Sequence, residues 1–151
     1  MEFKSFEEVI EFAINREIEA ADFYNKLQSL VKHESSIKLL KELEGMEIAH
    51  ADALRKFRKE DMESEYVPPK ILNLKIADTM EDINPQSEMN YQEILVLSIK
   101  AEQHANELYL KLADETEDPN TKNMFLRLAD EEAKHKLHLE QIYDDEFMVE
   151  N

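Results

Sequence analysis

The chain contains two copies of one helical pattern, and this internal repeat constrains the fold more than any other feature of the sequence. Residues 6–55 laid over residues 91–140, a shift of 85 positions without a gap, give eleven identities in fifty positions. Chance would give roughly three or four at this composition. The polar and aromatic identities include Glu17/Glu102, Tyr24/Tyr109, Glu47/Glu132 and His50/His135. Two structural units with the same internal plan are therefore expected.

Within each copy, apolar residues recur in steps of three and four, which predicts amphipathic helices of the bundle type. A single glycine and four prolines in 151 residues also favour long helices with few tight turns. Ser5 is the expected N-cap of the first helix, and Ser35 or Ser36 that of the second. Asp118 and Pro119 have the residue types of an N-cap and a first helical position. The predicted helices cover about residues 5–31, 36–60, 91–116 and 119–143.

The connections between these helices predict the topology. Within each copy the turn is short, so its two helices should be antiparallel neighbours. Residues 61–89 contain Pro68, Pro69 and Pro85 and are long enough to run the length of a helix bundle. One long crossover is typical of ferritin-like bundles. The expected fold is all-α, a single ferritin-like four-helix bundle domain over residues 1–151 with two repeated hairpins joined by the crossover.

Charge and composition exclude several classes of function. There are 18 basic and 35 acidic residues, a formal net charge of −17, which disfavours binding to nucleic acid or to an anionic membrane. No cysteine is present, which excludes disulfides, thiolate zinc sites and cysteine-ligated iron within these residues. The first residues show no signal-peptide pattern, and no segment has the roughly eighteen apolar residues of a spanning helix. A cytoplasmic protein is expected.

Six ionisable residues interrupt the apolar faces of the predicted helices: Glu17, Glu47, His50, Glu102, Glu132 and His135. Each copy thus contributes one glutamate and one Glu-x-x-His quartet, whose two side chains share a helix face. At a rise of about 1.5 Å per residue, the four carboxylates reach nearly the same height in a bundle. The alternative is that these residues are polar positions on a hydrated helix seam.

Burial of this set would need a counter-charge. Unpaired carboxylates in a dry core cost several kcal/mol each, and the inward faces carry no lysine or arginine that would neutralise them. Two divalent cations would cancel four negative charges and would be coordinated by both imidazoles. A carboxylate-rich, thiolate-free set suits iron or manganese, and zinc is also possible.

With these residues in place, the chain resembles a rubrerythrin-type member of the ferritin-like diiron-carboxylate superfamily. The resemblance implies that the six residues are ligands of two iron ions, and that Tyr24 and Tyr109 donate hydrogen bonds to ligand carboxylates. Two features depart from the family. No cysteine-ligated rubredoxin domain is present in these residues, so electrons would come from an external donor. Classical rubrerythrins also carry an extra glutamate near the ligand of the third helix. Here Ile99 and Ala105 occupy the positions one turn before and after Glu102, so this extra ligand is absent from them.

The resemblance implies a peroxidase that reduces hydrogen peroxide, or acts on dioxygen, with electrons from a rubredoxin-like or other reductase. One alternative with the same dimetal site is a ferroxidase that stores or delivers iron. Another is a helical scaffold with a structural metal or none. A homodimer is expected, and the length of residues 61–89 allows hairpins to be exchanged between two chains.

Overall fold

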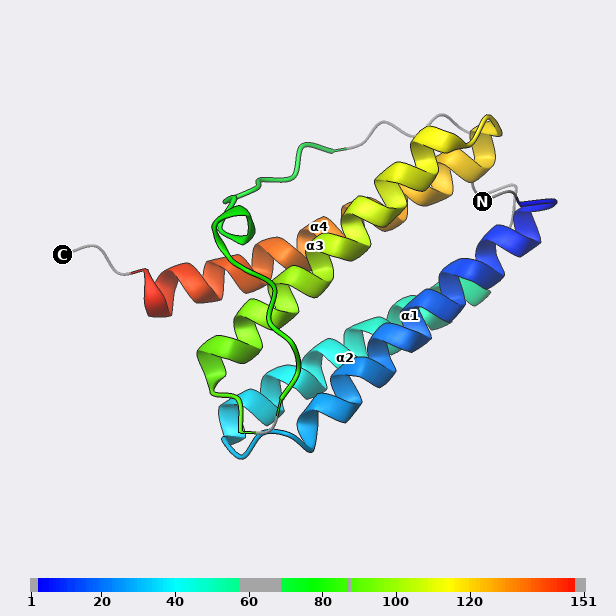
Figure 1. Cartoon of the computed structure of the whole chain (residues 1–151). Helices are drawn as coiled ribbons and strands as arrows, with labels where there is room; N and C mark the ends of the chain where they lie inside the picture. The colour runs from blue at the N-terminus through cyan, green and yellow to red at the C-terminus, as the bar shows by residue number, and fades with distance from the viewer. Residues whose placement is uncertain (1–2, 58–68, 87, 149–151) are drawn as a thin grey trace. The chain divides into compact units, whose positions relative to one another are not determined.

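The computed structural model describes residues 3–57, 69–86 and 88–148. The described residues contain four long α-helices, one short 3₁₀ helix and no β-strand (Figure 1). They divide into two compact units, one with α1, α2 and residues 85–91, the other with residues 69–84, α3 from Gln92 onward and α4. The elements are α1 (Phe6–Gln28), α2 (Glu34–Arg55), η2 (Ala77–Thr79), α3 (Tyr91–Glu115) and α4 (Pro119–Phe147). The all-α class, with the four helices of a ferritin-like bundle, is confirmed.

The first hairpin pairs α1 with α2 in antiparallel fashion. Near the turn, the side-chain amides of Asn25 and Gln28 donate to the Glu44 carboxylate at 3.0 and 2.8 Å. The Ser5 side chain accepts from the backbone N–H of Glu8 at 3.2 Å, so the predicted N-cap of α1 is confirmed. The bonds from Asn25 and Gln28 to Glu44 fix the position of α2 along the axis of α1.

The predicted cap of α2 is wrong. His33 has extended backbone angles, φ −75° and ψ 133°, and occupies the N-cap position without a side-chain hydrogen bond. The helix therefore begins at Glu34, two residues earlier than expected, because the turn after Val31 is shorter than predicted. Ser36 consequently lies within the first turn, where it is fully buried.

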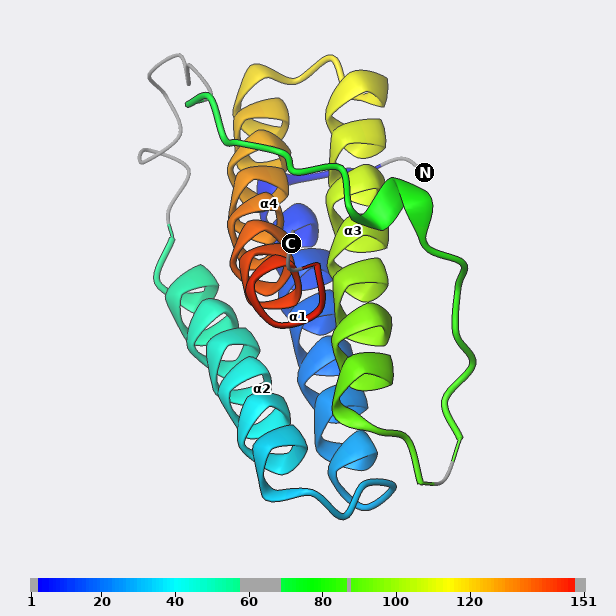
Figure 2. The same ribbon diagram turned by 90° about the vertical axis from the view of Figure 1, so that its left-hand side faces the viewer.

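The second hairpin pairs α3 with α4. Asn106 donates to the carbonyl of Ala129 at 2.7 Å, and the rings of Tyr109 and Phe125 stack with centroids 6.2 Å apart. The Asp118 side chain accepts a hydrogen bond from the backbone N–H of Thr121 at 3.0 Å, and Pro119 is the first residue of α4, as predicted. Figure 2 shows α3 and α4 side by side, joined by a short turn.

The helix starts keep the spacing of the sequence repeat. The first helices of the two hairpins begin at Phe6 and Tyr91, and the second helices at Glu34 and Pro119, so both pairs are offset by 85 residues. The ends vary more: α1 ends at Gln28 rather than near residue 31, and α4 continues to Phe147 rather than 143. α2 ends at Arg55, whereas its predicted end at residues 58–60 and the first part of the crossover, 61–68, lie outside the described residues.

The apolar face of each hairpin is its core. In the first unit the buried apolar residues include Val9, Ala13, Leu27, Leu40, Leu43 and Leu54, and in the second Ile94, Leu95, Ile99, Phe125, Leu128 and Leu139. The spacing of several of them by three or four residues, as in Val9 and Ala13 or Leu40 and Leu43, is that of the predicted amphipathic helices. Burial of such side chains, at roughly 25 cal/mol per Å² of apolar surface, is the main stabilising term for each hairpin.

Residues 69–84, the crossover strap, are anchored on α3 and α4. The strap has no regular secondary structure apart from η2, and Lys75 within it has a positive φ of 58°. The backbone N–H of Ala77 donates to Glu140 at 3.0 Å, and the Ala77 carbonyl accepts from Lys100 at 3.2 Å. Figure 2 shows this segment running across α3 and α4. Both backbone groups of one strap residue are thus used to hold it on the helices.

A buried ion pair lies beneath the strap. The Lys136 ammonium is 3.3 Å from the Glu140 carboxylate and donates to the side chain of Asn73 at 2.8 Å. The side chains of Lys136 and Glu140 are 9% and 0% exposed. The sequence did not predict the burial of Lys136, which bonds to the strap rather than to the candidate ligands. Its charge is stabilised by the strap and by Glu140, a partner one helical turn away.

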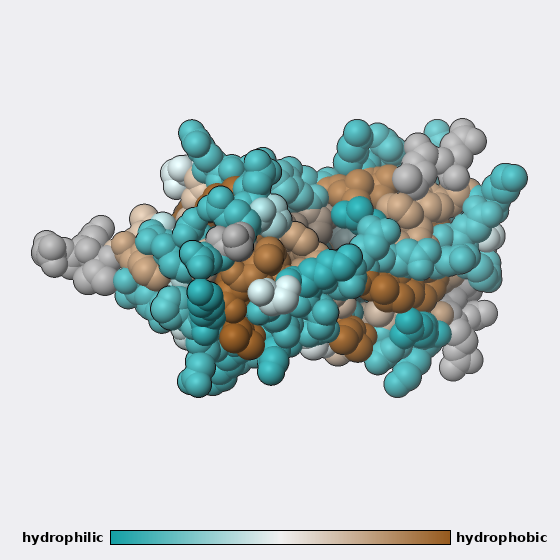
Figure 3. All heavy atoms as spheres, turned by 60° about the horizontal axis from the view of Figure 1, so that its bottom comes forward, coloured by the Kyte–Doolittle hydropathy of each residue, from teal (hydrophilic) through white to brown (hydrophobic). Residues whose placement is uncertain are grey.

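Polar side chains predominate on one face of the molecule (Figure 3). Hydrophilic side chains cover most of the face seen in Figure 3, and hydrophobic ones form separate patches. Among the described residues, no helix is both long enough and apolar enough to cross a membrane.

The anchor beneath the strap generates a stability prediction. Glu140→Ala removes the partner of a buried ammonium and the acceptor of the Ala77 N–H, so it should lower the free energy of unfolding by about 3 kcal/mol. Amide hydrogen exchange at Ala77 should accelerate. Glu146→Ala, an exposed change on the same helix, is the control and should stay within about 0.5 kcal/mol of the parent. Equal stability of the two variants would contradict this account of the anchor.

Candidate metal centre

The first hairpin brings together three of the six predicted ligands. Glu17 comes from the middle of α1, and Glu47 and His50 come from one face of α2, three residues apart. His50 Nδ1 lies 3.5 Å from Glu17 Oε2. One possible ligand atom from each of the three residues lies within 4.8 Å of the other two. These residues are called the first ligand set.

The second hairpin repeats the arrangement. His135 Nδ1 lies 3.6 Å from Glu102 Oε2 and 3.7 Å from Glu132 Oε2. One ligand atom from each of these three residues also lies within 4.8 Å of the other two. They form the second ligand set. Every member of it follows its counterpart in the first set by 85 residues, so the repeat in sequence is also a repeat in side-chain geometry.

The Glu–His spacing fits an ion between the two groups. A direct hydrogen bond from a protonated imidazole to a carboxylate would be about 2.8 Å long, whereas both observed spacings are near 3.5 Å. Two ligands at about 2.1 Å from one metal ion and 3.5 Å apart subtend an angle of about 110°, within the usual range for coordination. The spacing in each set is therefore that of two ligands of one metal ion.

Burial and charge support the same conclusion. All four glutamates are no more than 2% exposed, and the two histidine side chains are 15% and 11% exposed. Each set contains two carboxylates, whose ionised forms carry the charge that one divalent cation neutralises. The donor set, with two carboxylates and one imidazole, suits iron, manganese or zinc. The residues present fit a metal ion in each hairpin.

The two tyrosines proposed to support the ligands are buried as expected. Tyr24 and Tyr109 follow Glu17 and Glu102 by seven residues, two helical turns, on the same face and are each 1% exposed. Tyr109 stacks on Phe125, and Tyr24 contacts Phe23 with ring centroids 5.5 Å apart. Their hydrogen bonds to ligand carboxylates remain a prediction.

Sequence reasoning missed the polar residues that flank the second ligand set. Lys100, Gln103 and His104 on α3 bond to the crossover strap and surround Glu102 in sequence. Lys136 lies next to His135 and bonds to the strap from α4. The available signal was the spacing of Lys136 and Glu140, which is that of a helical ion pair, but the sequence did not indicate which segment would cover them.

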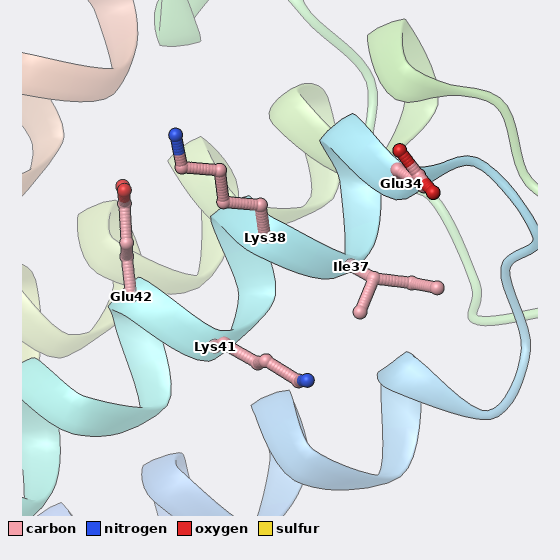
Figure 4. A pocket seen from close by; sticks show the side chains of 5 residues that line it. All are labelled: Glu34, Ile37, Lys38, Lys41 and Glu42. Atoms are coloured by element: carbon pink, nitrogen blue, oxygen red, sulfur yellow. The ribbon is translucent and has the colours of Figure 1, made fainter.

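A surface hollow on α2 is separate from the ligand sets. It is lined by Glu34, Ile37, Lys38, Lys41 and Glu42. Figure 4 shows that all five side chains come from α2 and that the charged ones extend away from the helix in different directions. The hollow includes no candidate ligand. It is a charged face of one helix, and we assign it no role in metal binding.

Comparison with known proteins gives one match. Residues 93–151 match the family model for rubrerythrin, so the resemblance inferred from the motifs is confirmed over α3 and α4. Searches of curated proteins and of solved structures returned no match. The matched segment contains all three residues of the second ligand set.

The geometry predicts which histidines hold metal. His50→Ala and His135→Ala should each lower the metal content of purified, iron-reconstituted protein by at least about half, because each removes the only imidazole of its ligand set. Inductively coupled plasma mass spectrometry measures the content. His33→Ala and His138→Ala change exposed histidines and are the matched controls. Unchanged content in the first pair, or equal loss in all four, would remove these histidines from the site.

Proposed function

We propose that this chain, whose second hairpin matches the rubrerythrin family, is a non-haem diiron redox protein that reduces hydrogen peroxide. In this proposal the two ligand sets act together on one pair of iron ions. The observation that carries it is the recurrence of the same Glu–His spacing, 3.5 and 3.6 Å, in both hairpins.

Ligand counting supports the pairing of the two sets. Three residues leave a divalent iron or manganese ion with open positions, since these metals take more ligands than a structural zinc site. Two glutamates that bridge would be shared and raise the coordination of both ions. Ferritin-like dimetal proteins have this composition, with one glutamate from each of two helices and Glu-x-x-His from each of the other two. The repeat supplies every member of that set.

The reaction balances with an external reductant. Hydrogen peroxide, two electrons and two protons give two water molecules as the O–O bond is cleaved. When bound, the iron pair would supply the two electrons at one place. The protein residues would hold the ions: the glutamates would offset the charge of the metal pair, and His50 and His135 would each supply an imidazole ligand. Buried neighbours such as Ala13, Ala21 and Ile99 limit the access of bulk water.

The proposed reductant is a separate electron-transfer protein, rubredoxin-like or another reductase. These 151 residues contain no cysteine and so cannot themselves hold an iron–tetrathiolate centre. The formal charge of −17 would favour a donor with a basic contact surface, because complementary charge raises the rate of encounter. A homodimer, with or without exchanged hairpins, belongs to the same proposal.

The proposal predicts rapid reoxidation by peroxide. Protein loaded with iron and reduced anaerobically should lose its reduced state within seconds of mixing with stoichiometric hydrogen peroxide, followed by stopped-flow absorption. Protein carrying both His50→Ala and His135→Ala should react at the rate of an equal amount of free ferrous iron. Loaded protein that stays reduced in peroxide would overturn the peroxidase proposal.

The same preparations separate the alternatives. Reoxidation by dioxygen with accumulation of many iron atoms per chain, in a large hollow oligomer seen by light scattering, would indicate iron storage instead. Bound metal without any redox reaction would indicate a structural role.

A further inference from the structure

The interior of the second hairpin contains a buried hydroxyl with no partner among the residues that the structure describes. Ser98 on α3 is 0% exposed, and its Oγ makes no hydrogen bond to them. A serine inside a helix commonly bonds back to the carbonyl one turn before it. Ser98 does not, so its donor and acceptor capacity is unused at a site where that is unfavourable.

Ser98 lies one helical turn before a predicted ligand. It precedes Glu102 by four residues, on the same face of α3. Long side chains on a helix lean toward its N-terminus and lie over the preceding turn, so the Glu102 carboxylate lies on the side of Ser98 and Ile99. Of these two neighbours, Ile99 offers only hydrocarbon. Ser98 is the polar one of the two.

The repeat shows that this hydroxyl is specific to one hairpin. The counterpart of Ser98 is Ala13, which precedes Glu17 by four residues and is also 0% exposed. The two ligand sets match in residue types and in their Glu–His spacing, but one glutamate has a hydroxyl a turn before it and the other has a methyl group.

We propose that Ser98 is a positioning residue that donates a hydrogen bond to the Glu102 carboxylate when the second ligand set holds its metal ion, and so makes the two metal positions unequal. This inference rests on the proposed dimetal function. A hydrogen bond to a ligand carboxylate fixes the oxygen that faces the metal, and loss of such a partner commonly weakens metal binding about 10- to 100-fold. The position served by Glu102 should bind its ion more tightly than the position served by Glu17.

The test compares Ser98→Ala with the parent in two measurements. The first is the affinity for Co²⁺, followed by its visible absorption in competition with a chelator. We expect two ions to bind the parent, and Ser98→Ala to weaken one of them about tenfold and to alter its absorption band. The second is the thermal midpoint of the metal-free protein, which should stay equal or rise because an unsatisfied buried hydroxyl is removed.

Three variants control the result. Ser36→Ala removes a second buried serine hydroxyl that has no partner among the described residues. Ser36 lies eleven residues before the candidate ligand Glu47 in the sequence, so this change should leave Co²⁺ affinity unchanged. Ser98→Thr keeps the hydroxyl and should restore binding. Ala13→Ser should strengthen the other metal position and reduce the inequality.

Unchanged Co²⁺ affinity in Ser98→Ala would overturn the inference while leaving the dimetal proposal intact. Failure of the parent to bind two ions would overturn the dimetal proposal itself. Equal weakening of both ions in Ser98→Ala would contradict a role confined to Glu102.

Discussion

The burial of two carboxylates beside one imidazole in each hairpin is the constraint on which the rest of the structure depends. Ionised carboxylates removed from water cost several kcal/mol each unless a cation or hydrogen bonds compensate them. Two helices that present them must also be held at a fixed depth, because a shift of one residue would turn the ligands away from each other. The amide contacts of Asn25 and Gln28 to Glu44, and of Asn106 to Ala129, fix that depth in the two hairpins.

The two hairpins differ where the crossover strap packs on the second. Ala51 and Arg55 in the first copy correspond to Lys136 and Glu140 in the second, where they form the buried ion pair beneath the strap. The second copy thus has Lys136 and Glu140 where the irregular backbone of the strap needs hydrogen-bond partners. The ligands were retained on the neighbouring face. The same pattern of helices and candidate ligands therefore occurs both in a hairpin that binds the strap and in one that has Ala51 and Arg55 at the corresponding positions.

Much of the fold was predictable because it follows from periodicity. Helix existence, the caps at Ser5 and Asp118 and the composition of the core depend on local patterns that a single sequence contains. The grouping of the candidate ligands was predictable because a polar interruption in an apolar stripe, repeated at one offset, is improbable by accident. The single-domain organisation, the roles of the two tyrosines and the identity of the metal stay predictions.

The remainder depends on long-range contacts that no local pattern encodes. The start of α2 was misplaced because two adjacent serines suggested a cap, while the extended backbone at His33 began the helix earlier. The burial of Lys136 could not be predicted because its partner Asn73 is 63 residues away. The sequence places Ser98 four residues before Glu102, but only the structure shows that its hydroxyl makes no bond to the described residues.

The proposed function requires that the two ligand sets hold one pair of metal ions. X-ray absorption at the metal edge of iron-reconstituted protein tests it most directly, because a neighbouring metal is a strong scatterer. A metal–metal distance of about 3.5–4 Å, usual for paired sites, is the predicted result, with nitrogen and oxygen ligands and no sulfur. Spectra that contain only light-atom ligands, in protein that holds two metal ions per chain, would show two separate ions and contradict the account.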